Sequence, residues 1–177
     1  MRVFDAKGHH AVLAWYEKRG GRWVERGRIE RVNIGRNGVG KEKEGDGRTP
    51  VGVYPLEDVY GYRDVETKMP FFLAADSLIC VDDPRSRYYN RIVDARLVKH
   101  DFDSFEKMRR RDGLYRILVT VGYNGEREQG KGSCIFLHVA DSAKATAGCV
   151  AMPLEALKRI AAWLDPAQKP VLVVEGP

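Results

Sequence analysis

One stretch of the sequence, Ser133–Ala140, constrains the fold more than any other because nearly all of its residues are apolar. In an extended strand, one face would carry Ile135, Leu137 and Val139, and the other would carry Cys134, Phe136, His138 and Ala140. A strand that is apolar on both faces has to be covered on both sides, so we expect it inside a layered fold. His138 is the odd residue, since burying an imidazole without a hydrogen-bond partner costs on the order of 2 kcal/mol. A histidine satisfied within the core is the alternative to a catalytic one.

The rest of the chain predicts a mostly β fold. Runs rich in β-branched and aromatic residues indicate strands, over Ala11–Lys18, Arg22–Ile34, Leu114–Tyr123 and Val171–Val174. Gly20 and Gly21 predict a tight turn that joins the first two strands into a hairpin. A glycine-rich loop is expected over Gly35–Gly47, and Thr49–Tyr54 indicates a short strand after it. Residues 60–90 have no lasting period and are expected to form short strands and loops.

Two helices are predicted. The first spans about Ser104–Arg111, because the short acidic side chain of Asp101 or Asp103 can cap its free N–H groups. The second follows Pro153 and places its apolar residues on one stripe as far as Leu164. The sequence therefore predicts many strands with a few helices packed on them.

Length and charge exclude several classes of protein. The 177 residues fit a single globular domain over residues 1–177, and the net charge of +5 is spread without a basic stripe, so we expect no nucleic-acid partner. The longest uncharged stretch is Ala145–Leu154, far short of the roughly 20 residues of a bilayer span. No membrane span is expected. Met1–Glu17 has no basic region followed by an apolar one, so no signal peptide is expected within this sequence.

Three cysteines leave at least one free thiol. Cys149 follows Gly148, which permits a sharp turn, and small residues flank it, so its thiol is open to a substrate. Cys149 comes eleven positions after His138, which is enough for the chain to return to an adjacent element. His138 would then take the thiol proton, because the thiolate is the attacking form. The alternative for each cysteine is a small, buried apolar residue.

A zinc site is not expected. Cys134 and His138 stand four positions apart in a predicted strand, which is roughly 13 Å at about 3.3 Å per residue. Zinc ligands lie at about 2.0–2.3 Å from the metal, and the sequence contains no Cys-x-x-Cys spacing. We therefore expect neither a metal nor another cofactor.

The segments around these two residues resemble a known family. Gly132–His138 followed by Thr146–Met152 looks like the catalytic core of the L,D-transpeptidases, the YkuD-type cysteine enzymes of the bacterial cell wall. Further segments of the same resemblance are Glu44–Tyr54, Arg85–Asn90 and Val121–Asn124. Each piece is weak alone, but their order is specific, and the resemblance runs from about Trp23 to Val174.

The resemblance implies a β-sandwich or partly closed barrel with a helix from the C-terminal half packed on the sheet. It implies that Cys149 attacks the carbonyl of the third residue of a peptidoglycan tetrapeptide stem and releases D-Ala. An acceptor amine then takes the acyl group and forms a 3→3 cross-link. His138 would serve as base and then acid, and the N–H groups of Gly148 and Cys149 would bind the oxyanion. We thus expect peptidoglycan stem peptides as partners, and we expect the protein to be a monomer.

The sequence departs from the family at two positions beside the nucleophile. Many members have a histidine where this chain has Ala147, and many have an arginine where it has Ala151. The sequence therefore leaves open which groups bind the substrate carboxylates. Arg48, Arg87 and Arg91 are candidates to take the place of the missing residues. The substrate-binding residues expected from the matching segments are Thr146, Ala147, Arg48 and Tyr123. Because Val139 follows His138, the group that orients the imidazole would be a backbone carbonyl or Asp141.

Two other functions stay open. Water in place of the acceptor amine would make the protein an L,D-carboxypeptidase or amidase on the same stems. The third hypothesis is a catalytically silent module that binds the cell wall. It is suggested by the absence of the histidine and the arginine that many members carry beside the cysteine. Either enzyme would act in the periplasm or the extracellular cell wall, where Cys80 and Cys134 are able to pair, although Cys134 could equally line the floor of the cleft.

Overall fold

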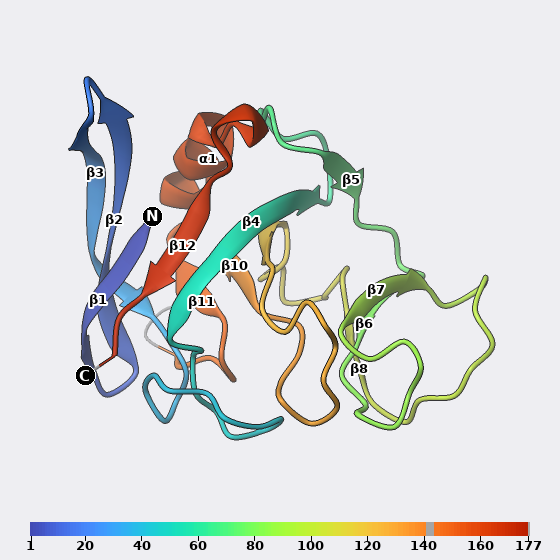
Figure 1. Cartoon of the computed structure of the whole chain (residues 1–177). Helices are drawn as coiled ribbons and strands as arrows, with labels where there is room; N and C mark the ends of the chain where they lie inside the picture. Colours follow the sequence, from blue (N-terminus) through green and yellow to red (C-terminus); the bar gives the residue numbers. More distant parts are fainter. Residues whose placement is uncertain (141–143, 177) are drawn as a thin grey trace.

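The computed structural model describes residues 1–140 and 144–176, and these are mostly β. The strands are β1 (Arg2–Lys7), β2 (His10–Arg19), β3 (Arg22–Asn33), β4 (Gly52–Gly61), β5 (Phe71–Leu73), β6 (Leu78–Val81), β7 (Arg91–Asp94), β8 (Phe105–Lys107), β9 (Ile117–Val121), β10 (Phe136–Val139), β11 (Val150–Met152) and β12 (Val171–Val174). The described ranges contain one α-helix, α1 (Leu154–Trp163), and a short 3-10 turn, η1 (Pro166–Gln168). The expected fold class is confirmed (Figure 1).

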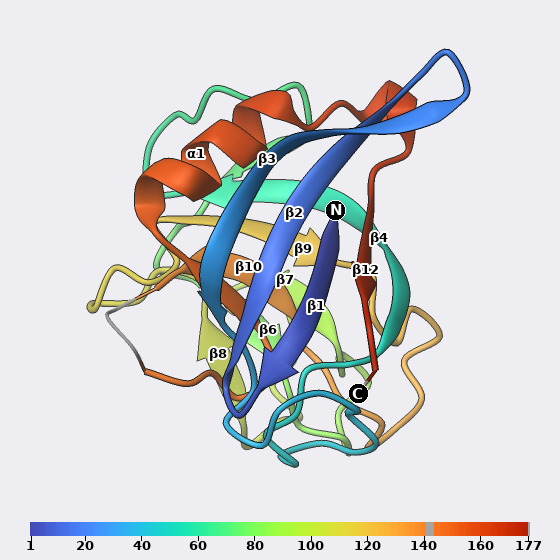
Figure 2. The same ribbon diagram turned by 90° about the vertical axis from the view of Figure 1, so that its left-hand side faces the viewer.

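The larger sheet closes on itself. Its nine strands run in the order β12-β1-β2-β3-β11-β10-β9-β4-β5, and β12 pairs with β4 as well as with β1. Eight strands therefore form a ring, with β5 added outside β4. The ring has its fewest paired residues between β11 and β3, where Ala151 and Asn33 form the one registered pair. A partly closed barrel, as the resemblance implied, describes this sheet (Figure 2).

The hairpin of β2 and β3 follows directly from the sequence. Arg19 pairs with Arg22, and the two glycines between them have φ of 54° and 79°. Two successive residues with positive φ make the turn whose twist matches that of the paired strands, and glycine adopts it without a steric penalty. The predicted hairpin is confirmed. β1, which pairs with β2 and in parallel with β12, was not predicted.

The two faces of β10 divide the interior into two apolar clusters, as its alternation predicted. Ile135, Leu137 and Val139 lie in the main core, while Cys134 and Phe136 lie in a second cluster. The main core also takes the buried face of α1, which includes Leu157 and Ile160, and Leu164 directly after the helix. Each such aliphatic side chain contributes roughly 1.5–3 kcal/mol by leaving water. The helix predicted after Pro153 is confirmed, and it packs against the large sheet.

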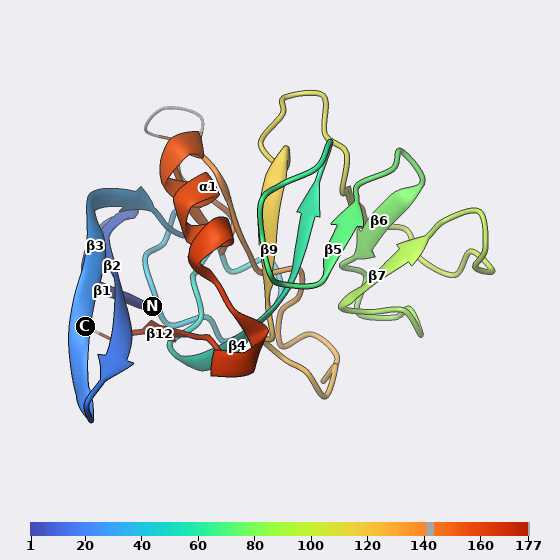
Figure 3. The ribbon, with the colours of Figure 1, turned by 90° about the horizontal axis from the view of Figure 1, so that it is seen from above.

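A small sheet of three strands, β7-β6-β8, lies beyond β9 and β5, on the far side from the β1–β3 strands (Figure 3). Polar groups hold the loops that join its strands. The carboxylate of Asp83 accepts from the N–H of Arg85 at 3.0 Å and from that of Asp103 at 2.8 Å, and it also binds the Arg85 guanidinium. These bonds lower the pKa of Asp83 below its usual value. A disulfide between Cys80 and Cys134 ties this sheet to the chain just before β10.

The helix predicted over Ser104–Arg111 is wrong. Phe105–Lys107 forms β8, an antiparallel neighbour of β6 in which Glu106 lies opposite Cys80. Asp103 does not cap a helix, because its own N–H donates to Asp83. A helix of two turns is marginal without packing, and here the pairing with β6 decides the conformation instead.

Two predicted strands begin later than expected. Residues 114–116 form turns, so β9 starts at Ile117. Cys134 has a φ of 53°, in the left-handed region, so β10 starts at Phe136. No helix in the described part of the chain is long and apolar enough to cross a bilayer. The assignment of the whole chain to a single domain stays a prediction.

Candidate active site

Cys149 lies at the end of a tight turn that leads into β11. Thr146 closes this turn: its hydroxyl donates to the carbonyl of Cys149 at 2.6 Å and accepts from the N–H of Gly148 at 3.1 Å. The backbone of Thr146 is held in turn, since its N–H donates to Ile34 and its carbonyl accepts from Arg36, both at 2.9 Å. Thr146 thus positions the thiol through the backbone.

Gly148 is required by a close approach of the chain. A Cβ at this position would lie 2.9 Å from the carbonyl oxygen of Arg48 and 3.2 Å from the Cδ1 of Ile135. Any larger residue would push the turn away from the loop that precedes β4. The Gly148 N–H already donates to Thr146. The oxyanion-binding roles expected of Gly148 and Cys149 stay predictions.

The thiol of Cys149 is buried, with 6% of the residue exposed. It donates to the carbonyl of Cys134 at 3.4 Å and accepts from the N–H of Phe136 at 3.3 Å. Burial, followed by the nearby carboxylate of Glu106, raises the pKa of Cys149 to about 12. The Cys149 thiol is therefore protonated at neutral pH, and it is buried rather than open as its small neighbours predicted.

A hydrogen bond to the backbone defines which ring nitrogen of His138 carries the proton. Its Nδ1 lies 2.9 Å from the carbonyl oxygen of Val139. A carbonyl only accepts, so Nδ1 carries the proton in this arrangement and Nε2 is the basic nitrogen. Burial lowers the pKa of His138 to about 4, which keeps the ring neutral. Of the two orienting groups considered, the backbone carbonyl is the one present, while Asp141 lies outside the described residues.

β10 and β11 bring the predicted catalytic pair onto one face. They are parallel neighbours, with His138 opposite Ala151. Because Cys149 lies two residues before Ala151, its side chain points to the same side as that of His138. Within residues 1–140 and 144–176 the two side chains bond to backbone groups rather than to each other.

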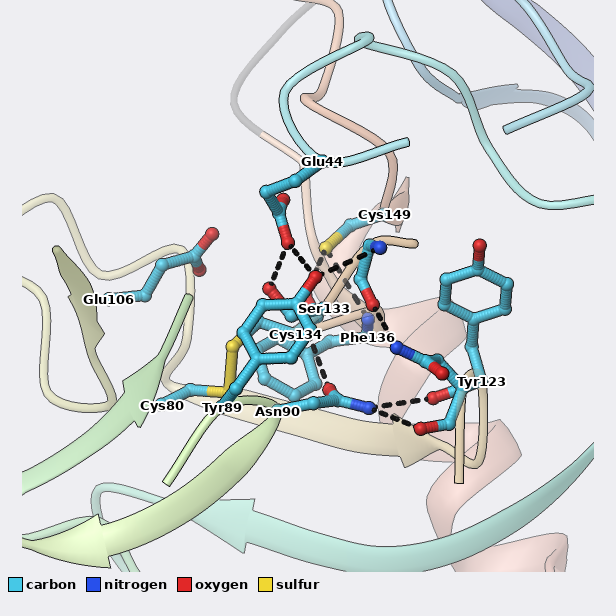
Figure 4. Close-up of a disulfide and its surroundings, with 12 residues drawn as sticks. Glu44, Cys80, Tyr89, Asn90, Glu106, Tyr123, Ser133, Cys134, Phe136 and Cys149 are labelled. Atoms are coloured by element: carbon cyan, nitrogen blue, oxygen red, sulfur yellow. Dashed lines mark hydrogen bonds between the residues drawn. A yellow bond between two sulfur atoms is a disulfide. The ribbon is translucent and has the colours of Figure 1, made fainter. Parts of the chain in front are cut away.

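A carboxylate from the glycine-rich loop bonds to the chain just before β10 (Figure 4). The Oε2 atom of Glu44 accepts from the hydroxyls of Tyr89 and Ser133, each at 2.6 Å. The Glu44 N–H donates to the carbonyl of Gly130 at 2.7 Å. These three bonds fasten the loop over the chain that precedes β10.

A buried ion pair organises the same loop. The ammonium of Lys41 lies 2.9 Å from the carboxylate of Asp46, which also accepts from the N–H groups of Glu42 at 2.8 Å and Arg48 at 3.0 Å. Burial alone would raise the pKa of Asp46, but these hydrogen bonds outweigh it and lower the pKa below its usual value. The positive charge of Lys41 also acts to lower the pKa of Cys149.

The Cys80–Cys134 disulfide and Asn90 hold the carbonyl that meets the thiol. Asn90 donates to the carbonyls of Tyr123 at 2.9 Å and Asn124 at 3.0 Å, and it accepts from the N–H of Cys134 at 2.9 Å (Figure 4). The left-handed φ of Cys134 is thus supported on one side by the S–S bond and on the other by an amide side chain.

The other predicted substrate-binding residues lie as follows. The guanidinium of Arg48 is exposed and donates to the carbonyl of Val39 at 3.1 Å, so its backbone, rather than its charge, meets the catalytic turn. Ala147 is exposed. Tyr123 is buried, and its hydroxyl donates to the carbonyl of Lys131 at 2.7 Å. Their roles stay predictions.

A cavity of about 470 Å³ reaches the back of this site. Its lining includes Cys80, Asn90, Arg91, Cys134 and Phe136. Arg91, one of the three arginines considered for a substrate carboxylate, therefore lies in the wall of this cavity. Arg87, another, is paired with Asp101 at 2.7 Å. Neither Cys149 nor His138 belongs to the lining.

Among the described residues, no three or more His, Cys, Asp or Glu side chains are arranged to hold a metal ion. The absence of a cofactor stays a prediction. Sequence reasoning missed Glu106, since it placed that residue on a helix, and it gave no role to Tyr115. Tyr89 and Asn90 lie in a segment of the resemblance, which was the signal that pointed to them.

Residues 3–173 match the family model YkuD, described as the L,D-transpeptidase catalytic domain. This range covers nearly the whole chain and contains both His138 and Cys149. Comparison with curated proteins gives no match.

Proposed function

Because this chain belongs to the YkuD family of L,D-transpeptidase catalytic domains, we propose that it transfers peptidoglycan stem peptides through a thioester on Cys149, with His138 as the proton carrier. The observation that carries the proposal is the pairing of β10 with β11, which sets the two side chains on one face. The expected location of this activity is the cell wall.

The first half-reaction forms the thioester. The Cys149 thiol gives its proton to Nε2 of His138 as its sulfur attacks the carbonyl carbon of the third stem residue. The N–H of Cys149 stabilises the oxyanion, and one such donor is worth roughly 3 kcal/mol. When the intermediate collapses, the C–N bond breaks and His138 returns the proton to the amine of the departing D-Ala.

The second half-reaction regenerates the thiol. An acceptor amine attacks the thioester, His138 takes a proton from that amine, and the C–S bond breaks. The proton then returns to the sulfur. Water in the place of the amine gives a free carboxylate and a hydrolase.

The two pKa values bear on how the proton moves. With Cys149 at about 12 and His138 at about 4, the thiolate–imidazolium pair is strongly disfavoured in the resting protein. Proton transfer is therefore coupled to C–S bond formation. The alkylation rate of Cys149 should accordingly rise steadily toward alkaline pH, without a plateau near neutrality.

Intact-mass spectrometry tests the proposal. We expect incubation with a defined tetrapeptide stem or a carbapenem to give an adduct on the wild type and none on Cys149→Ala. His138→Gln should slow acylation by at least a hundredfold. A labelled Cys149→Ala protein would overturn the assignment of the nucleophile. Products that contain 3→3 dimers support transfer, whereas tripeptides alone indicate hydrolysis, and a thiol that resists every electrophile indicates a silent binding module.

A further inference from the structure

We propose that Tyr115 and Glu106 are positioning residues of this site: Glu106, on the small sheet, anchors the Tyr115 hydroxyl, and the Tyr115 ring in turn fixes the imidazole of His138. This inference depends on the proposed function only in its turnover measurement; its other measurements do not need that activity. Neither residue belongs to the segments on which the family resemblance was based.

The hydroxyl of Tyr115 is committed to Glu106. It donates to the Oε2 atom of that carboxylate in a short hydrogen bond, and 4% of Tyr115 is exposed. Glu106 lies on β8, opposite Cys80 of β6. The anchor therefore comes from the small sheet, beside the disulfide that joins this sheet to Cys134.

The ring of Tyr115 touches the catalytic strand. It meets the His138 ring edge-on, with centroids 5.2 Å apart and planes at 66°, and it meets Phe136 at 5.6 Å and 83°. The carbonyl of Leu114 accepts from the N–H of Val139 at 3.0 Å, which holds the Tyr115 backbone beside β10. Such edge-on contacts have a preferred geometry.

Among the residues that the structure describes, the imidazole has one hydrogen bond, from Nδ1 to the Val139 carbonyl. One bond leaves the ring free to tilt about that contact. The Tyr115 edge supplies a second constraint, and it stays in place because its hydroxyl is anchored at the opposite end. Together the two contacts direct Nε2 to one side.

Charges from several elements meet at this pair. The charged side chains that act on the pKa of Cys149 are Glu106, Lys41 and Arg110. Those that act on the pKa of His138 are Arg110 and Asp112. The pKa of Glu106 responds to the side chains of Tyr115, Asp82, Arg110 and Glu44. The Arg110 guanidinium lies 5.1 Å from the centre of the Tyr115 ring and is paired with Asp112 at 2.5 Å. Within this set, the negative charge of Glu106 raises the pKa of the thiol.

Two substitutions separate the effect of the Tyr115–Glu106 hydrogen bond from the effect of the Glu106 charge. Tyr115→Phe keeps the ring and the Glu106 charge but removes the anchor. Glu106→Gln keeps an acceptor for the Tyr115 hydroxyl but removes the charge. Tyr54→Phe is the matched control, because it also removes one tyrosine hydroxyl bond to the protein, to the carbonyl of Val51 at 2.6 Å, from β4 of the large sheet.

Three measurements follow: kcat and KM with a tetrapeptide stem, the pH midpoint of Cys149 alkylation by iodoacetamide, and the 15N shifts of His138, assigned with His138→Gln. For Tyr115→Phe we expect kcat to fall about tenfold at unchanged KM, and the 15N shifts to move toward the average of the two tautomers. For Glu106→Gln we expect kcat within threefold of wild type and an alkylation midpoint at lower pH.

The proposal is overturned if Tyr115→Phe matches Tyr54→Phe in both kcat and the His138 shifts, or if Glu106→Gln leaves the alkylation midpoint in place. Should Tyr115→Phe melt below the assay temperature, Glu106→Ala replaces it, since this change removes the anchor but keeps the ring, and the same loss is expected. A wild type that is alkylated normally but turns over no stem peptide contradicts the proposed function, while the alkylation midpoint and the 15N shifts still decide the inference.

Discussion

The large and the small sheet meet at Cys149, but they are held together by different forces. In the large sheet, strands ring an apolar core that also takes one face of α1. The apolar cluster of the small sheet has three buried members, Ile79, Val81 and Phe102. Its loops depend on aspartate–arginine bonds such as that of Asp83 with Arg85, and on one disulfide.

This difference teaches how the site divides its tasks. The large sheet supplies His138 and Cys149 on adjacent strands whose register is fixed by burial on both faces. The small sheet and its loops supply the polar contacts around them, from Glu106, Tyr89 and Asn90. A stable frame thus carries the two groups proposed to react, and a less apolar region supplies their polar surroundings.

The largest expected effect tests the core of the large sheet. Leu157→Ala removes a fully buried side chain where α1 packs on the sheet, and we expect a loss of about 4 kcal/mol in the free energy of unfolding. Urea unfolding measures it, with the exposed neighbour Lys158→Ala as control. A loss below 1 kcal/mol would show that the helix is not part of the core that holds this sheet.

Removal of the disulfide tests the small sheet. Cys80 and Cys134 are 54 residues apart, and chain entropy for a loop of that length gives as much as about 4 kcal/mol. We expect the double variant Cys80→Ser, Cys134→Ser to lose hydrogen-exchange protection in β6 to β8 first, while β1 to β3 keep theirs. Equal loss in both sheets would mean that they open as one unit, and the comparison fails.

His138, on β10 of the large sheet, should make stability depend on pH. The folded pKa of His138 is about 4, against about 6.5 in an unfolded chain, so the unfolded state takes up the proton first. Stability is therefore lost as pH falls from 6.5 to 4, by up to about 3 kcal/mol. Urea unfolding at pH 7 and pH 4.5 measures this loss. His138→Gln should reduce it, and an identical slope in both proteins would contradict the shift.

The smallest effect is expected at the tip of the β2–β3 hairpin. Trp23 is 68% exposed there, so Trp23→Ser should change the free energy of unfolding by less than about 0.5 kcal/mol. Thermal melts of the two proteins check it. A loss above 1 kcal/mol would mean that this end of the hairpin is part of the structural core.

The sequence predicted the large sheet better than the small one, for a physical reason. Its hairpin, its β10 strand and its helix each carry a local signal: two glycines, alternation of apolar residues, and an amphipathic stripe. The small sheet has short strands whose conformation depends on pairing with distant partners. Phe105–Lys107 was predicted as helix because local propensity does not reveal that this segment pairs with the distant strand Leu78–Val81.

The candidate site divides in the same way. Cys149 and His138 stand out in the sequence because a cysteine follows Gly148 and an imidazole interrupts an apolar strand. Glu44 and Ser133 are 89 residues apart, yet their side chains meet at 2.6 Å, and no local pattern announces such a pair.

The sequence by itself determined the mostly β class, the free thiol and the two faces of the strand that carries His138, because each of these is written in the spacing of neighbouring residues. Tertiary structure alone decided the closure of the barrel through β12 and β4, the pairing of Cys80 with Cys134, and the contact of Glu106 with Tyr115. Each of those joins residues from separate elements, and the packing of the whole chain, rather than any local preference, sets their distance.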